Sequence, residues 1–488
     1  YTGMSIDQDQ AVGSDAAVLW RIFKLAAEQR GRLTLAIIGI LAAAVFQLMI
    51  PQFLGDAVDG AVRLLGSATI SAAEAKDALY NAAWLLLGAS VLRGIFTLLH
   101  NYCGETLGHH LSYRLRLAFY QKLQNLNFSF HDSVHTGELI TRGMLDLEGV
   151  RSFMNTGPLR VLLLGVLIGF GAYLLLSIDL ALGALSLSFV PFVAWRSASA
   201  RLHLRELWFA LQDRMGVLGR IMDENLTGIR VVRAFGAEPY ELDKYDVASD
   251  QASALAAHRI RVRVSSTTVM NFAFFISMGL VLWMGGQEVI DGKMTVGTLT
   301  EFLTFMTILQ LPVRQLGMVV NSFARASTCG ARLFAVLDLE PTIREADQAA
   351  ALEPSEARVR FENVSFVYGA DEEAAPPVLH DISFEVARGE TLGIVGPPGS
   401  GKSTIAHLLP RYYDVTSGRI TIDGKDIRDV SLDSLRHEVR VVQQDAFLFT
   451  ASLENNIAYG DPWADDDAVQ DAAGLAQIDG FVDGLPDG

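Results

Sequence analysis

The sequence has 488 residues, of which 50% are hydrophobic and only 19% are charged, and its formal net charge is −16. A soluble domain typically carries about 25% charged residues, so this composition indicates that part of the chain faces lipid. The acidic balance argues against nucleic acid as a partner, because proteins that bind nucleic acid need a basic surface. The two cysteines, Cys103 and Cys329, lie too far apart in the sequence to indicate a disulfide or zinc framework.

The first 32 residues are expected to form an N-terminal cytoplasmic segment that ends in an amphipathic helix. Between residues 16 and 32 the apolar residues Leu19, Trp20 and Phe23 recur at helical spacing, and basic residues lie between them. This pattern is typical of an "elbow" helix that lies on a membrane surface. The alternative is an ordinary amphipathic helix that packs on protein.

Six stretches then reach the roughly 20 apolar residues that a helix needs to cross a bilayer. The expected spans are 33–58, 80–102, 157–177, 180–200, 264–287 and 296–318. Together they predict an all-α transmembrane domain over residues 33–320. Arginine and lysine are concentrated before the first span and in the connections 103–156 and 201–263, which places these segments in the cytoplasm by the positive-inside rule. An even number of spans returns the C-terminal part to the same side.

Both long connections are expected to be mostly helical, with membrane helices that continue well past the bilayer. Each contains a short break, "HDSVHTGELITR" in the first and "ENLTGIRVVRAFGAEPY" in the second, punctuated by glycine and proline. A helical turn at each break would press on a partner domain, and the alternative is a plain loop.

A polar and acidic stretch within residues 321–356 is expected to be a linker to a second, α/β domain at 357–488. Two strands are predicted in "RVRFENVSFVY" and "LHDISFEVARGETLGIVG". We expect Leu392–Val395 to be a buried strand that ends directly in a phosphate-binding loop. The sequence thus predicts a multi-domain protein, a six-helix transmembrane domain followed by an α/β P-loop NTPase domain.

The loop satisfies the spacing G-x-x-x-x-G-K-[ST] at Gly396, Gly401, Lys402 and Ser403. Backbone amides after a strand and the N-terminus of the next helix would cradle phosphate oxygens. Lys402 would reach the β- and γ-phosphates, and the Ser403 hydroxyl would bind Mg²⁺. The expected cofactors are therefore ATP and Mg²⁺. The residues predicted to contact the nucleotide are Gly396, Pro397, Pro398, Gly399, Ser400, Gly401, Lys402, Ser403 and Thr404.

The phosphate-binding loop indicates roles for two further residues. Tyr368 lies upstream in "SFVYG", where its ring would stack on adenine, and an ordinary strand tyrosine would be the favoured interpretation if the P-loop were absent. Gln444 follows a short apolar run that we expect to be a strand, and its amide would ligate Mg²⁺ or orient water. The alternative for Gln444 is a solvated surface side chain.

Six spans, two long helical connections and a C-terminal P-loop domain resemble half of an ABC transporter of the exporter type. In that family "HTGELITRGMLDLEGVR" is similar to the first coupling region, here near 128–151, and "ENLTGIRVVRAFGAEPYE" to the second, near 223–241. Tyr368 resembles the adenine-stacking residue, residues 396–404 the Walker A motif and Gln444 the Q-loop glutamine, so Lys402 and Gln444 are the implied catalytic residues. The coupling residues that match are Gly137, Glu138, Arg142, Asp146, Glu224, Gly228, Phe235 and Glu238.

The resemblance implies ATP-driven efflux or flipping of a small amphipathic or lipid-like molecule, by alternating access, in a cell membrane with the nucleotide domain in the cytoplasm. The implied partner is a second half-transporter, in a homodimer or a heterodimer, with membrane lipids and the small-molecule substrate. The chain ends before the LSGGQ signature and the Walker B strand of the family, so we expect a truncated nucleotide domain that alone would hydrolyse ATP poorly. The alternatives are an importer of a chelated metal with the exporter fold and a membrane-attached ATP switch that transports nothing.

Ionisable residues within spans are candidates for contact with substrate. Arg93 lies in the second span and Glu301 near the outer part of the sixth. The alternatives are pairing with a neighbouring helix for Arg93 and exposure at the membrane interface for Glu301.

Overall fold

The computed structural model describes residues 15–66, 72–346, 349–353, 356–369 and 376–485. Residues 1–14 of the predicted N-terminal segment, parts of the predicted linker (347–348 and 354–355) and the last residues 486–488 lie outside this description. The chain divides into two compact units. One comprises the residues up to Leu126 together with His131–Glu340, and the other comprises Asn127–Phe130 together with the residues from Pro341 onward.

The first unit is entirely helical in its described part. Six helical segments there are long and apolar enough to cross a membrane, which confirms the six predicted spans. Several continue far beyond the predicted apolar stretch, as expected for helices that extend into the cytoplasm. The helices are α1 (Asp15–Ala27), α2 (Arg30–Gly66), α3 (Ala72–Asn125), α4 (Phe128–Ser133), α5 (Thr136–Thr141), the π-helix η1 (Arg142–Asp146), α6 (Leu147–Thr156), α7 (Pro158–Ile178), α8 (Leu180–Leu187), α9 (Phe189–Thr227), α10 (Ile229–Phe235), α11 (Glu238–Ile290) and α12 (Val296–Leu337).

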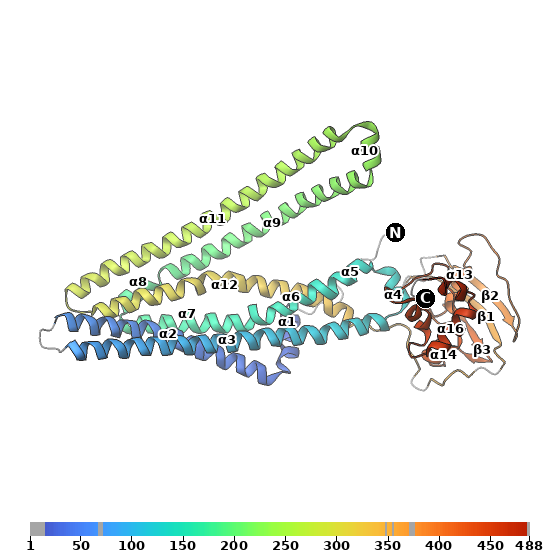
Figure 1. The fold of residues 1–488 in the computed structure, drawn as a ribbon, viewed down its shortest axis with the longest axis horizontal. Coiled ribbons are helices and arrows are strands. Elements are labelled where there is room, and N and C mark those ends of the chain that lie inside the picture. The colour runs from blue at the N-terminus through green and yellow to red at the C-terminus, as the bar shows by residue number, and fades with distance from the viewer. Residues whose placement is uncertain (1–14, 67–71, 347–348, 354–355, 370–375, 486–488) are drawn as a thin grey trace. The chain divides into compact units, whose positions relative to one another are not determined.

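Two groups of helices make up this unit. Helices α2, α3, α7 and α12 lie along one another, whereas α9 and α11 run side by side, diverge from that group and are joined at their far end by α10 (Figure 1). The apolar core lies where α12 meets its neighbours, and Phe302, Phe305 and Met306 are completely buried there. This core holds the cytoplasmic extensions of α9 and α11 on a fixed base.

The predicted linker is shorter than the range 321–356. Helix α12 continues to Leu337, because buried apolar residues recur at helical spacing through Leu333. Gly330 leaves room for α1, since an added Cβ would lie 2.8 Å from Val18 and 2.9 Å from Ile22. Helix α1 thus packs on protein through one face, and the Trp20 indole stays 66% exposed, available to a membrane surface. One face of this helix therefore packs on protein, and contact of the other face with a membrane surface stays a prediction.

The second unit contains a four-stranded antiparallel sheet with the order β2-β1-β3-β4. Buried side chains of the sheet, such as Phe361 and Ile420, pack against α13 and α14 in one apolar core. The elements are β1 (Val359–Phe366), β2 (Leu379–Val386), α13 (Lys402–Leu408), β3 (Ser417–Ile422), β4 (Lys425–Asp426), α14 (Leu432–Glu438), α15 (Leu453–Ile457), the 3₁₀-helix η2 (Ala458–Gly460), α16 (Asp466–Leu475) and α17 (Asp479–Val482).

Two strand predictions in this unit are wrong. Residues 392–395 form no strand, and Val395 is 96% exposed. The apolar run before Gln444 also forms no strand, and Val442 is 97% exposed. A β-strand is stabilised by the strands beside it, because its backbone groups must find partners there. The described residues supply no such neighbour to either run, so their β-branched composition alone does not make them strands.

Candidate nucleotide-binding site

The predicted phosphate loop is built by two glycines with left-handed backbone conformation. Gly399 and Gly401 have φ angles of +80° and +86°, which residues with a side chain rarely adopt. Gly401 directly precedes α13, and a Cβ on it would lie 2.7 Å from Leu379 Cδ2. Both features explain why the loop needs glycine at this position. Pro397 starts a turn in which its carbonyl accepts a hydrogen bond from the Ser400 backbone N–H.

Lys402 folds back over the loop. Its Nζ donates hydrogen bonds to the carbonyl oxygens of Gly396 at 3.0 Å and Pro397 at 2.8 Å. The ammonium group is thereby held above the same backbone that would surround phosphate oxygens. These hydrogen bonds join a half-buried lysine to its own loop, so an anion with several charged oxygens can replace the carbonyl partners. The position fits the predicted role of Lys402.

The first turn of α13 brings three predicted residues together. Ser403 is exposed, whereas Thr404 is buried, and the Thr404 hydroxyl lies 3.2 Å from the Tyr368 hydroxyl. Tyr368 also contacts the Phe366 ring edge-to-face, with ring centroids 4.7 Å apart. These contacts fix the Tyr368 ring beside the loop, and 39% of the residue stays exposed for a further partner.

The far end of α13 is anchored by Arg436 of α14. Its guanidinium donates to the carbonyl oxygens of Pro410 and Arg411, each at 3.3 Å. Burial lowers the pKa of Arg436, because the charged form loses solvation there. The hydrogen bonds satisfy carbonyls just beyond the helix end, and so they hold the helix that carries Lys402. This anchor is separated in sequence from the loop, and no sequence motif identifies it.

Gln444 is not brought to the loop by any interaction in the described part of the chain. It is exposed, and its side chain forms no hydrogen bond among the described residues. The structure therefore leaves the predicted Mg²⁺ role of Gln444 as a prediction.

The donors at the loop fit a nucleoside triphosphate with Mg²⁺. Backbone N–H groups at a glycine-rich turn, an ammonium group and a hydroxyl at a helix start are the groups that bind phosphate oxygens and a phosphate-bound Mg²⁺. The exposed Ser403 hydroxyl is the candidate metal ligand, and the Tyr368 ring is the candidate base platform.

The first predicted coupling region contains a buried charged cluster. Glu138 pairs with Arg142, which lies in the π-helix η1 with Asp146. Both Arg142 and Asp146 are buried, and Asp146 Oδ1 accepts a hydrogen bond from Arg332 Nη2 of α12 at 2.5 Å. A π-helical turn is rare and often marks a functional position. Arg332 was missed by sequence reasoning, since 186 residues separate it from Asp146. Gly137 lies in α5 with open space around it.

The second predicted coupling region is the helical turn α10. Gly228 ends α9 and Gly236, with a φ of +61°, ends α10, so the two glycines isolate one short helix. Phe235 on this helix is 82% exposed. Glu224 lies 3.6 Å from Lys244 Nζ and links α9 to α11, which begins at Glu238. The break is a helical turn, as predicted, and not a plain loop.

The two candidate substrate contacts have different surroundings. Arg93 is exposed on α3 and has no ion pair or hydrogen bond among the residues that the structure describes. Glu301 is half-buried against α2, where its Cβ lies close to Gly55. The alternative of pairing within the chain is thus not seen for Arg93, and Glu301 faces protein more than an interface. The structure does not bring these two residues together through any interaction.

Family models match both units. Residues 33–313 match the model described as "ABC transporter transmembrane region", and residues 379–485 match the model described as "ABC transporter". The first match covers all six apolar helices in part, and the second includes the loop at 396–404.

Individual relatives agree with these matches. An uncharacterized ABC transporter ATP-binding protein of Bacillus subtilis is 32% identical over 83% of this chain and 70% of its own length. An ATP-dependent lipid A-core flippase of Desulfotalea psychrophila is 31% identical over 79% of this chain and 66% of its own. A multidrug efflux ATP-binding/permease protein of Mycobacterium bovis is 32% identical over 96% of this chain, which is 38% of that protein. The chain thus spans about two thirds or less of several relatives.

A solved structure is similar along most of the chain. The structure of a bacterial Atm1-family ABC exporter with ATP bound superposes with a TM-score of 0.72 at 28% sequence identity. The match covers 94% of this chain and 79% of the other.

Proposed function

Because this chain belongs to the ABC transporter family, as a half-transporter of the exporter type, we propose that it moves a small amphipathic or lipid-like molecule across the membrane by ATP-driven alternating access. It is a multi-pass membrane protein, with its nucleotide-binding unit in the cytoplasm. The proposal concerns the cargo, the direction of transport and the residues that carry out each step.

The observation that carries the proposal is the geometry of the phosphate loop in a chain with six apolar spans. Lys402 is held over the backbone of Gly396 and Pro397 and would move onto the β- and γ-phosphates. Ser403 would ligate Mg²⁺, which offsets the charge of the triphosphate when it is bound. Tyr368 would stack on the adenine. Gln444 would approach the metal only after a change in the exposed segment that carries it.

The two coupling regions would transmit closure of the nucleotide domains to the membrane helices. Helix α10 presents Phe235 at the end of two long rigid helices, so a small displacement of this turn moves both α9 and α11. The pair of the buried Asp146 with the partly exposed Arg332 would connect the first coupling region to α12 in the same way. ATP biases this equilibrium because the closed arrangement binds ATP more tightly than the open one.

A second half-transporter is the proposed partner. Helices α9 and α11 diverge from the other spans (Figure 1), and they carry large exposed apolar side chains. Trp195 of α9 and Phe272 of α11 are each 65% exposed. Surfaces of this kind mark a contact with protein or lipid. We propose that a second half-transporter covers part of this surface.

The cargo is proposed from chemistry and from what the relatives are named for. One relative is named as a lipid A-core flippase and another as a multidrug efflux protein, and a small amphipathic or lipid-like cargo is compatible with both names. Arg93 is exposed on the apolar helix α3 and would contact an anionic headgroup. Glu301 would contact a polar group near the outer end of the sixth span. These two contacts are proposals.

The test reconstitutes the full-length protein in liposomes and follows a fluorescent amphipathic lipid across the bilayer with and without ATP. Transport that requires ATP and Lys402 would support the proposal. ATP turnover with no movement of any amphipathic probe, but with movement of a chelated metal, would favour the importer alternative. Nucleotide binding without turnover in any lipid would favour the switch.

A further inference from the structure

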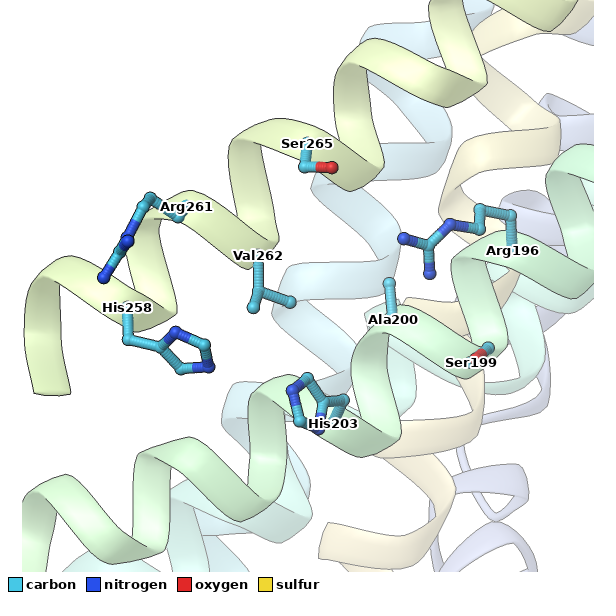
Figure 2. Close-up of a pocket in the computed structure, with 8 residues that line it drawn as sticks. All are labelled: Arg196, Ser199, Ala200, His203, His258, Arg261, Val262 and Ser265. Carbon is cyan, nitrogen blue, oxygen red and sulfur yellow. The ribbon is translucent and has the colours of Figure 1, made fainter.

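A basic pocket lies between α9 and α11, with a cavity volume of about 640 Å³. Figure 2 shows Arg196 extending from α9 into the space between the two helices, and the rings of His203 and His258 approaching each other from opposite helices. The residues that line the pocket are Arg196, Ser199, Ala200 and His203 of α9 and His258, Arg261, Val262 and Ser265 of α11.

The pocket lies where the two helices leave the bilayer. The apolar stretch of the fourth span ends near residue 200, and that of the fifth span begins near residue 264, so the lining residues occupy the boundary on both helices. The positive-inside distribution of arginine places this boundary at the cytoplasmic leaflet. A ligand in the pocket is therefore at the depth of lipid headgroups.

The two arginines that line the pocket have no acidic partner among the described residues. None of the eight lining residues is acidic, and neither Arg196 nor Arg261 forms an ion pair or hydrogen bond among the described residues. Neighbouring arginines are engaged elsewhere in the structure. Arg259 lies over the Trp208 ring at 4.7 Å, and Arg201 donates to the Arg314 carbonyl. Arg196 and Arg261, which both line the pocket, thus keep their hydrogen-bond donors for a ligand.

The histidines and serines that line the pocket add further hydrogen-bond donors to those of the arginines. The imidazoles of His203 and His258 contact each other edge-to-face, with ring centroids 6.3 Å apart, so they bring the two helices together at the pocket. One acidic group lies nearby, since Glu206 is 3.6 Å from His203 Nδ1. Ser199 and Ser265 add one hydroxyl from each helix. Guanidinium, imidazole and hydroxyl groups are all donors that bind phosphate oxygens, and here both helices contribute them.

We propose that this basic pocket binds a phosphate group that enters from the cytoplasmic side, at the depth of the inner leaflet. Two sources share that chemistry, the phosphate headgroup of an anionic lipid and a soluble phosphate ester. Basic pockets between membrane helices on the cytoplasmic side are typical sites for anionic headgroups. The position at the boundary favours the lipid, whose acyl chains would lie along the apolar parts of α9 and α11. The proposal does not depend on transport or on ATP.

The experiment measures binding of phosphatidic acid to the full chain in nanodiscs of phosphatidylcholine, without nucleotide, by native mass spectrometry. The test variant is Arg196→Gln/Arg261→Gln. The matched control is Arg263→Gln, which removes an exposed arginine of the same helix that does not line the pocket. Because a hydrogen bond to a charged group contributes about 1.5–3 kcal/mol, loss of both guanidiniums is expected to weaken binding at least about tenfold, and the control to change it less than about twofold. Retained helicity by circular dichroism checks that each variant is folded.

Each outcome decides the proposal. Unchanged binding in the double variant, or an equal loss in Arg263→Gln, would overturn it, because the effect would then be general surface charge. A separate arm uses glycerol 3-phosphate in a detergent solution free of anionic lipid. Binding of this ester that depends on Arg196 and Arg261, without binding of phosphatidic acid, would keep the phosphate site and assign it to a soluble ligand. Failure of ATP-driven transport would leave all these measurements unaffected.

Discussion

The hydroxyl groups of Tyr368 and Thr404 lie 3.2 Å apart and join the segment after β1 to the first turn of α13. The candidate base platform and the candidate phosphate loop are therefore fixed to each other before any nucleotide binds. Preorganisation of this kind reduces the entropy lost on binding. The hydroxyl of Tyr368 contacts Thr404, whereas its ring face is proposed to contact the base. Two different substitutions can therefore test the hydroxyl and the ring independently.

Replacing Tyr368 by alanine is expected to lower ATP affinity about tenfold, because stacking of an aromatic ring on a base contributes about 1–3 kcal/mol. Tyr368→Phe keeps the ring and removes only the contact with Thr404, so it is expected to bind within about threefold of the unchanged protein. Titration with a fluorescent ATP analogue measures both. Equal losses in the two variants would show that the hydroxyl acts and the ring does not.

The Asp146–Arg332 pair predicts a measurable loss of stability. Arg332→Met leaves the buried Asp146 carboxylate without its partner, and breaking a buried pair is strongly destabilising. Because the Arg332 side chain is itself 44% exposed, we expect a smaller cost of about 1–2 kcal/mol in the free energy of unfolding. Thermal unfolding in detergent measures it.

The matched control for this pair is the double variant Asp146→Asn/Arg332→Met. Removing both charges leaves no unpaired carboxylate, so the unfolding midpoint is expected to return most of the way to the original value. The two single variants, Asp146→Asn and Arg332→Met, are measured beside it. If the double variant loses as much free energy of unfolding as the two single variants added together, the residues do not interact directly.

Phe235 is expected to matter for coupling and not for stability. Its side chain is 82% exposed on α10, so Phe235→Ala should change the free energy of unfolding by less than about 0.5 kcal/mol. Substrate-stimulated ATPase activity should fall, because the turn would lose the apolar side chain proposed to contact a nucleotide domain. Ile290→Ala is the control, since Ile290 is 86% exposed at the other end of α11. Equal effects on stimulation in the two variants would exclude a special role for Phe235.

The local geometry of the candidate phosphate loop was predictable because its residues are consecutive. Gly396, Gly401 and Lys402 act through the local backbone, so their spacing in the sequence is also their arrangement in space. Features that depend on two distant segments were not predictable. Asp146 and Arg332 meet only when α12 packs beside η1. The basic pocket likewise depends on how α9 and α11 align.

The membrane helices were predictable because length and hydropathy decide whether a segment crosses a bilayer. Their cytoplasmic extensions followed from helical spacing, and the end of α12 at Leu337 was underestimated because small residues such as Gly330 lowered the apolar signal. The strand expected at 392–395 failed for another reason. A single sequence does not show whether neighbouring strands are present to complete the pairing.

The most direct test of the account is the ATPase activity of the full-length protein in lipid nanodiscs, compared with Lys402→Ala. Among the described residues Lys402 Nζ forms hydrogen bonds with its own loop alone, and the side chain stays partly exposed, so the variant should keep its fold and its membrane helices. The account predicts ATP turnover by the original protein and its loss, by about a hundredfold or more, in Lys402→Ala. Turnover that is unchanged in Lys402→Ala would contradict the assignment of this loop as the catalytic phosphate site.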